Sequence, residues 1–351
     1  MKFSFLLLIV WFLVGCVKKP NETPQPAPQP AYKGVFILNE GQWGLNGSTI
    51  SYYDENNGYQ SVADVFSVVN GAKLGDTGNF ILQDADTLYV VVNNSRMIYK
   101  IQMPSFKLIG KINLPDGSSP RMMLKISPNK AYINSLLDGI IYIINPVTMQ
   151  LEANKIIVEK YPEAMVRVDN EVFITCGNYA PPAKNNKVAK VNSLNDNLLG
   201  YIELPIGNPG PIVFTNNKVH IACRDHNKHI SCVSVINPSS FSIDTTLYLA
   251  GSLYDMKLIN NNLYITNDSC ITQLNLSNYK IIYNYFSRTE LGAKTNDLIY
   301  GIAFDSLKNE WYINNAGYGA INGKCIILNA QKQIVRQLNT GVFPKEVFFY
   351  R

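Results

Sequence analysis

The chain has 351 residues, of which 46% are hydrophobic and 16% charged, and its formal net charge is +5. This low and nearly balanced charge gives no reason to expect a nucleic-acid partner. The length alone would allow two domains, so the number of domains has to be inferred from the order of the apolar segments.

Residues 1–16 have the pattern of an export signal. Lys2 supplies a positive start, residues 3–14 form an apolar run too short to span a membrane comfortably, and the run ends in Leu-Val-Gly before Cys16. This ending resembles a bacterial lipobox, which implies that residues 1–15 are removed and that Cys16 is lipidated. The protein would then be anchored to a membrane without spanning it. The alternative is an ordinary signal peptide in which Cys16 is incidental.

The next segment predicts a tether. Five prolines occur between positions 17 and 32, without apolar periodicity. Such a composition favours an extended chain, so we expect residues 16–33 to hold the remaining domain, residues 34–351, away from the membrane.

Short apolar segments fill the rest of the chain. The clearest set lies at 122–126, 131–134, 140–145 and 149–158; these segments are rich in Ile, Val and Tyr and end at Asn, Asp, Gly or Pro. Each therefore predicts a strand followed by a turn. The second segment of the set recurs every 41 to 48 residues, with its middle residue at Tyr89, Tyr132, Phe173, His220, Tyr264 and Tyr312. Four strands in a repeat of this length are typical of β-propeller blades.

The two ends of the chain predict how the ring closes. The first repeat has segments at 35–38, 48–53 and 59–66 but no strand before them, whereas the chain ends on an extra segment, 344–350. We expect 344–350 to pair with 35–38. The predicted fold is thus all-β, a seven-bladed β-propeller closed by its C-terminal strand.

In such a ring one face, here called the upper face, carries the loops between the second and third strands of each blade and the loops that join blades. The longest of these loops are rich in Tyr, Trp, Asn and Arg. Loops of this kind on a rigid scaffold suit recognition of a large, partly apolar ligand. The predicted upper-face loops between strands are 39–47, 178–186, 224–229 and 315–322, and those between blades are 70–78, 118–121, 160–162, 207–211, 252–255 and 295–300.

The segments ILNEGQWGLNGSTISYYD (37–54) and LGDTGNFILQDADTLYVVVNNSRMIYKI (74–101) resemble the opening of Bacteroidetes surface propeller lipoproteins of the YncE-like group. One branch of that group, the BtuG type, captures vitamin B12 and passes it to a TonB-dependent outer-membrane transporter. The resemblance implies a lipid-anchored outer-membrane protein, exposed at the cell surface, with cobalamin or another corrinoid as ligand and such a transporter as partner. From the residues themselves we expect no cofactor and no enzymatic activity. The tail after Cys16 lacks an acidic run, which leaves the outward orientation open.

A corrinoid is a broad apolar disc with an amide fringe and a nucleotide tail, so its binder needs aromatic contacts and neutral amide partners. From their predicted positions on the upper face we expect five aromatic contacts, Trp43, Tyr179, Tyr254, Tyr300 and Tyr318; four amide partners, Asn46, Asn178, Asn267 and Asn315; and two guanidinium groups for the phosphate of the tail, Arg121 and Arg224.

Two other functions remain open. A protein-binding scaffold at the cell envelope would use the same face, and a propeller hydrolase would need a metal held there by Asn, Asp and Glu. The chain has three histidines and no Gly-x-Ser-x-Gly motif, so nucleophilic catalysis lacks its usual parts.

The cysteines do not determine in which compartment the protein lies or whether it has a metal site. Cys223, His226, His229 and Cys232 have a spacing compatible with zinc, but they flank one hairpin loop and need not converge. Cys176 and Cys223 follow equivalent strands of adjacent blades, so a disulfide and two buried free thiols are both compatible with the sequence.

Overall fold

The computed structural model describes residues 31–177, 185–225, 227–267 and 270–351. The predicted signal (1–15), the lipidation position Cys16, most of the tether predicted over 16–33, and the site candidates Asn178 and Tyr179 lie outside the described residues. Within the described ranges, no helix has the length and apolar character needed to cross a membrane.

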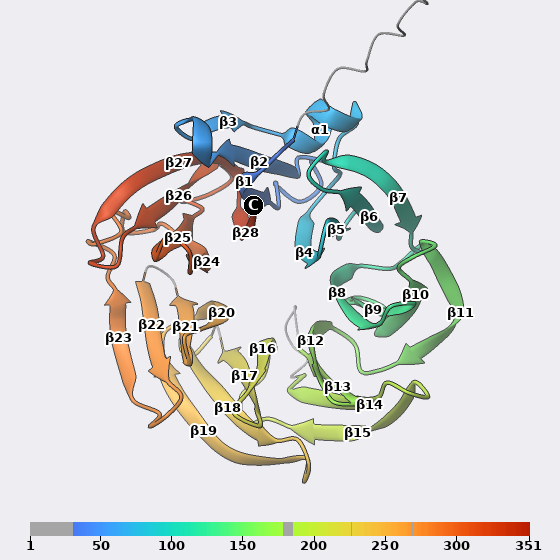
Figure 1. Cartoon of the computed structure of the whole chain (residues 1–351). Helices are drawn as coiled ribbons and strands as arrows, with labels where there is room; N and C mark the ends of the chain where they lie inside the picture. Colours follow the sequence, from blue (N-terminus) through green and yellow to red (C-terminus); the bar gives the residue numbers. More distant parts are fainter. Residues whose placement is uncertain (1–30, 178–184, 226, 268–269) are drawn as a thin grey trace, which may run out of the picture. The chain divides into compact units, whose positions relative to one another are not determined.

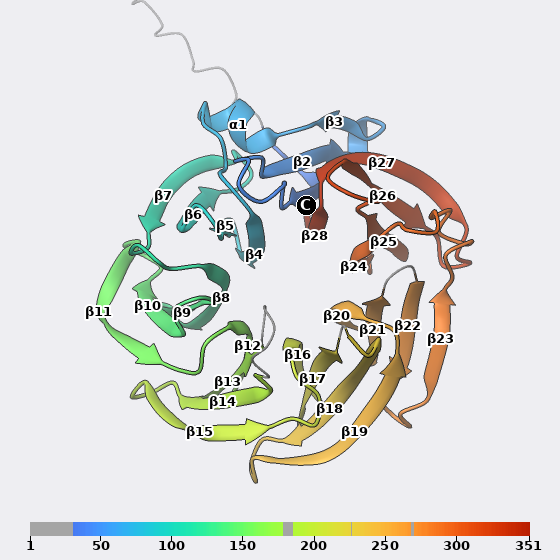
Figure 2. The ribbon, with the colours of Figure 1, turned by 180° about the vertical axis from the view of Figure 1, so that it is seen from behind.

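Seven four-stranded antiparallel sheets surround a central channel (Figure 1), and Figure 2 shows the same ring from behind. Six of the sheets use four consecutive strands, and the first strand of each lies nearest the channel. These six blades are β4 (Gly78–Asp84), β5 (Thr87–Val92), β6 (Met97–Gln102) and β7 (Lys107–Asn113); β8 (Pro120–Ser127), β9 (Lys130–Ser135), β10 (Ile140–Asn145) and β11 (Gln150–Ile157); β12 (Pro162–Val168), β13 (Glu171–Cys176), β14 (Lys187–Asn192) and β15 (Asn197–Glu203); β16 (Pro209–Thr215), β17 (Lys218–Asp225), β18 (Ile230–Asn237) and β19 (Ser242–Ala250); β20 (Leu253–Ile259), β21 (Asn262–Asn267), β22 (Cys270–Asn275) and β23 (Ile281–Phe286); and β24 (Ile299–Asp305), β25 (Glu310–Asn315), β26 (Asn322–Leu328) and β27 (Ile334–Val342).

The remaining blade joins the two ends of the propeller and confirms the predicted closure. Its order is β28 (Pro344–Tyr350), β1 (Gly34–Asn39), β2 (Thr49–Asp54) and β3 (Gln60–Val62). Strand β28 pairs antiparallel with β1, and Phe36 faces Phe348 with ring centroids 4.6 Å apart and nearly parallel planes. The seven-bladed all-β fold is therefore as predicted.

The repeated second strands are continuous in apolar character because both of their faces are covered. Strand β9 illustrates this: Ala131, Tyr132 and Ile133 are fully buried, between one neighbouring blade on each side. The outermost strands differ, since residues 150–155 of β11 are exposed. Burial on both faces explains why the second strand gave the clearest sequence repeat.

The expected fourth strand of the first repeat, 59–66, is wrong in part. Only β3 is extended, and Val65 begins helix α1 (Val65–Asn70) after the short 3-10 helix η1 (Glu55–Asn57) and β3. The Asp64 side chain accepts a hydrogen bond from the backbone N–H of Ser67, and Gly71 ends the helix in a left-handed conformation. A capping carboxylate and a C-terminal glycine stabilise a helix where apolarity alone suggested a strand.

The first and last residues of the propeller lie at the face opposite the upper face, which is called here the lower face. The backbone N–H of Tyr32 donates to the carbonyl of Pro104, in the loop between β6 and β7, at 2.8 Å. Gly34 pairs with Tyr350, so the chain enters and leaves the propeller near the same point. The upper face therefore points away from the entry of the chain.

The five cysteines of the described residues are free, so the disulfide considered between Cys176 and Cys223 is not formed. Cys223 instead faces Cys232 across β17 and β18. Burial, with the neighbouring Cys232 thiol, raises the pKa of Cys223 well above its ordinary value. In the described part of the chain, no group of three or more His, Cys, Asp or Glu side chains could hold a metal ion; His226 lies outside that part.

Candidate functional site

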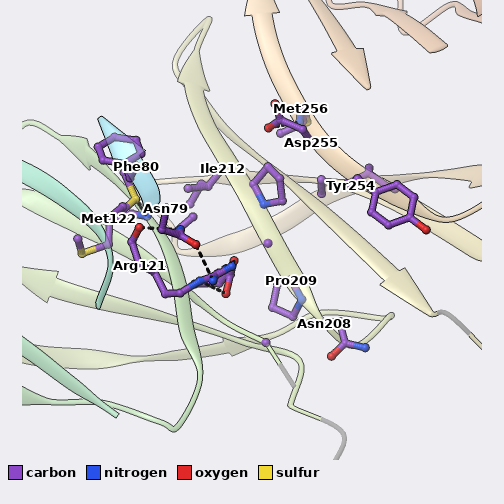
Figure 3. A pocket seen from close by; sticks show the side chains of 18 of the residues that line it. Asn79, Phe80, Arg121, Met122, Asn208, Pro209, Ile212, Tyr254, Asp255 and Met256 are labelled. Atoms are coloured by element: carbon purple, nitrogen blue, oxygen red, sulfur yellow. Dashed lines mark hydrogen bonds and ion pairs between the residues drawn. The ribbon is translucent and has the colours of Figure 1, made fainter. Parts of the chain in front are cut away.

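A cavity of about 250 Å³ occupies the upper end of the channel. Its walls come from the first residues of the inner strands β4, β8, β12, β16, β20 and β28 and from the ends of second strands, including Arg224 in β17. Apolar side chains such as Met122, Ile212 and Met256 alternate with charged ones, and Figure 3 shows several of them around the space. We call this space the central cavity.

Arg121 is held by partners on both neighbouring blades. Its Nε donates to both carboxylate oxygens of Glu163 at 3.1 and 3.0 Å, and its Nη1 donates to Asn79 Oδ1 at 2.7 Å (Figure 3). Burial by itself would raise the pKa of Glu163, but the charge and hydrogen bonds of Arg121 lower it below its ordinary value. Arg121 therefore has its hydrogen-bonding groups committed to the protein.

Lys345 and Tyr300 share a second carboxylate at the channel mouth. Lys345 Nζ lies 2.7 Å from Glu40 Oε1, and the Tyr300 hydroxyl donates to Glu40 Oε2 at 2.7 Å. Burial, with the adjacent Glu40 charge, raises the pKa of Tyr300 well above its ordinary value, so this hydroxyl stays a donor at physiological pH. These contacts join β24, β28 and the end of β1.

Lys257 lies between two carboxylates in the same channel. Its Nζ is 3.1 Å from Glu346 Oε1 and 3.8 Å from Asp255 Oδ2. Burial would lower the pKa of Lys257, but the two carboxylates outweigh it and raise that pKa. Burial raises the pKa of Asp255 against the opposing effect of Lys257, and Glu346 adds to the rise.

Arg224 has a different environment. Its Nη1 donates to the backbone carbonyl of Leu253 at 2.9 Å, and its guanidinium carbon lies 5.7 Å from the centroid of the Tyr254 ring. Among the described residues, no carboxylate forms an ion pair with it. This guanidinium lines the central cavity beside an aromatic ring.

A second hollow, of about 440 Å³, lies on the upper face between the last two blades and is called here the upper groove. Tyr254, Tyr318 and Phe343 line it together with residues 295–298. Tyr254 borders the upper groove and the central cavity, so the two spaces are adjacent.

The predicted site residues fall into three groups. Arg121, Arg224 and Tyr254 meet in the central cavity, Tyr318 joins Tyr254 in the upper groove, and Tyr300 lies at the channel mouth. The other described candidates either form hydrogen bonds within loops or lie exposed on a loop. Asn315 is buried, donates to Asp297 and accepts from the backbone N–H of Gly317; Asn267 accepts from the backbone N–H of Cys270; and Trp43 and Asn46 are exposed on the loop after β1.

Sequence reasoning missed most of the polar groups of the channel. Three of the missed groups, Asn79, Glu163 and Lys345, are the second residue of an inner strand, and aligning the seven inner strands would have revealed these three. The second residues of the seven inner strands are Asn79, Arg121, Glu163, Gly210, Tyr254, Tyr300 and Lys345.

Several solved structures share this fold at low identity. A quinonprotein alcohol dehydrogenase-like protein from Bacteroides thetaiotaomicron VPI-5482 aligns with a TM-score of 0.67 and 14% identity over 91% of this chain and 78% of its own. The computationally designed Ika8 protein aligns with a TM-score of 0.58 and 12% identity, over 90% of this chain and 89% of its own. The dihydro-heme d1 dehydrogenase NirN, in complex with DHE, aligns with a TM-score of 0.58 and 9% identity over 93% of this chain and 77% of its own. At these identities the likeness concerns the fold alone.

No curated protein matches the sequence. A family match covers most of the propeller, from the start of the first blade to the loop between β25 and β26. By this match over residues 33–320, the chain belongs to the family described as a domain of unknown function, DUF5074.

Proposed function

We propose that this β-propeller is a non-enzymatic binding protein that captures a bulky nutrient at its upper face, with cobalamin or another corrinoid as the ligand. The observation that carries the proposal is the adjacency of the central cavity and the upper groove through Tyr254. Together they offer a ligand a broad, partly aromatic surface next to a deeper polar space. Protein sites for large organic ligands combine these two features.

The chemistry of the two spaces suits such a ligand. Tyr254, Tyr318 and Phe343 can cover an apolar disc, while Asn79 and Asn208 in the central cavity offer amide groups near its fringe. Both asparagines already make hydrogen bonds within the protein, which holds their side chains in place.

The resemblance to YncE-like surface lipoproteins extends the proposal to location and partner. We propose an outer-membrane protein anchored through Cys16, with its upper face at the cell surface, that hands the ligand to a TonB-dependent transporter. The chain enters the propeller at the lower face, so a tether there would leave the upper face accessible to a partner.

The test is thermal unfolding of the full chain in detergent micelles with and without cyanocobalamin. A ligand at a hundred times its dissociation constant stabilises the folded state by about 2.7 kcal/mol, so the melting temperature should rise by several degrees. Replacing both Tyr254 and Tyr318 by Ala should weaken binding at least about tenfold. Tyr283→Ala, which removes an exposed tyrosine of the outer strand β23, is the matched control. An unchanged melting temperature at saturating cyanocobalamin would exclude the corrinoid.

A protein-binding scaffold is the second candidate, and exposed apolar side chains favour it. Trp43 and Tyr318 are each 72% exposed, and Leu45 and Ile321 are exposed on the same two upper-face loops. Large exposed apolar side chains near one another often mark protein interfaces. Under this function, a bait of the full chain would retain an envelope protein, a Trp43→Ala bait would not, and calorimetry with cyanocobalamin would show no heat of binding.

A further inference from the structure

The charged side chains of the channel are arranged unevenly. Three cations have acidic partners: Arg121 with Glu163, Lys345 with Glu40, and Lys257 with both Glu346 and Asp255. With Arg224, which also lines the central cavity, there are four cations and four carboxylates, so the charges balance in number. The extra carboxylate lies beside Lys257, and the extra cation is Arg224. The pairing is therefore uneven, because Lys257 has two carboxylate neighbours whereas Arg224 forms no ion pair with a carboxylate of the described residues.

The position of Arg224 leaves hydrogen-bonding capacity for a ligand. A guanidinium has five N–H groups, and the described contacts of Arg224 use one nitrogen, Nη1, for the Leu253 carbonyl at 2.9 Å. The Tyr254 ring beside the group limits its movement. Arg224 also lines the cavity, so its remaining donors can meet a group that enters the space.

We propose that Arg224 and Tyr254 form an oxyanion subsite, which binds a phosphate ester or carboxylate carried on a flat apolar body. This inference rests on the proposed function, since it assigns a ligand class to the same cavity. A guanidinium can hold two oxygens of an oxyanion with two parallel hydrogen bonds, and these bonds are stronger than neutral ones. The adjacent ring of Tyr254 provides apolar contact for the body of the ligand.

The other polar groups of the cavity direct an anion to this subsite. Glu163, Asp255 and Glu346 would repel an anion, and each lies beside a cation that is already engaged. Arg121 has its donors on Glu163 and Asn79. An entering oxyanion therefore finds its strongest available partner at Arg224.

The experiment uses three probes that differ in one group: phenyl phosphate, phenylacetate and benzyl alcohol. Their affinities for the full chain in detergent micelles are measured by calorimetry for the wild type, Arg224→Gln, Arg224→Lys and Arg336→Gln. Arg336 is the matched control, because its guanidinium carbon lies 4.3 Å from the Tyr59 ring centroid, outside the central cavity. Gln at position 224 retains a donor for the Leu253 carbonyl, which limits damage to the fold.

We expect the wild type to bind at least one anionic probe about tenfold more tightly than benzyl alcohol. Arg224→Gln should abolish this difference, Arg224→Lys should restore part of it, and Arg336→Gln should leave it unchanged. The subsite is overturned if the wild type shows no preference for the anionic probes, or if Arg224→Gln keeps the preference. Both results are independent of cyanocobalamin binding, so failure of the subsite and failure of the corrinoid proposal can be told apart.

Discussion

The second residue of each inner strand determines the chemistry of the channel mouth. The backbone position is equivalent in all seven blades, but the side chains include a guanidinium, a carboxylate, an ammonium, an amide and two phenols. Arg121 and Glu163 occupy this position in neighbouring blades and form an ion pair. A propeller can therefore change its ligand by exchanging side chains at one repeated position, while the strands behind them keep the fold.

We expect the buried His220 to contribute to the pH dependence of the stability of the ring. His220 in β17 is 1% exposed, and its Nδ1 has no hydrogen-bond partner among the described residues. Burial lowers the pKa of His220 from 6.5 to about 4. Between these values the unfolded chain binds a proton that the folded chain does not, so the free energy of unfolding falls as the pH falls from about 6.5 to about 4, by up to about 3 kcal/mol.

Urea denaturation of the wild type and His220→Leu at pH 7 and pH 4.5 measures this contribution. The loss of unfolding free energy between the two pH values should be smaller in His220→Leu than in the wild type, by about 2 kcal/mol. His229→Gln, which alters an exposed histidine, should behave as the wild type. Equal losses in the wild type and His220→Leu would show that His220 does not titrate in this way.

At the scale of elements, the inner strands converge so closely that one of them requires a glycine. A Cβ atom added to Gly301 in β24 would lie 2.1 Å from the backbone oxygen of Lys345 in β28. Backbone atoms cannot move aside as a flexible side chain can. The absent side chain at position 301 therefore allows these strands to approach.

Gly301→Ala should lower the free energy of unfolding by about 3 kcal/mol, because the added methyl group forces the two inner strands apart. Gly210→Ala is the matched control. Gly210 is the second residue of the inner strand β16, whereas Gly301 is the third residue of β24, and no atom lies within 4 Å of a Cβ added to Gly210. That control should be neutral or slightly stabilising. Equal stability of the two variants in urea would contradict the close approach of β24 and β28.

At the scale of the whole molecule, one strand closes the ring. Strand β28 supplies the inner strand that the first blade lacks, and Phe348 and Tyr350 belong to the apolar cluster between the first two blades. Without β28, the edge of β1 and one side of this cluster would be open to water.

Deleting residues 344–351 should therefore abolish the single cooperative unfolding transition, since the loss of Phe348 alone would cost about 3 to 5 kcal/mol. Deleting Arg351 alone removes its ion pairs with Glu55 and the buried Asp305, which should cost up to about 3 kcal/mol but leave a single cooperative transition. A peptide of residues 344–350 added to the truncated chain should pair with β1 and restore the transition in calorimetry. A truncated chain that melts like the full one would show that closure contributes little.

The sequence by itself determined the class of fold, the number of blades and the closing strand. Each of these follows from short-range patterns: an apolar second strand recurs because both of its faces are buried, and a surplus strand such as 344–350 can pair only where a strand is missing. Local patterns also placed Arg121, Arg224 and Tyr254 at the upper end of their strands. Local patterns could not show that the segment 59–66 divides into the strand β3 and the start of helix α1. An apolar run of this length is compatible with a strand or a helix until its capping residues are identified.

Only the tertiary structure decided which polar groups meet in the channel. Tyr300 donates to Glu40 across 260 residues of sequence, and Lys345 contacts both Glu40 and Asn79. Such partners come from different blades, and their distances depend on how the ring closes, which no spacing along the chain encodes. The physical reason is that the pattern of a strand depends on local burial, whereas contacts in the channel depend on how seven inner strands converge around one axis. This convergence gives Arg121 its partner Glu163 and leaves Arg224 without a carboxylate partner among the described residues.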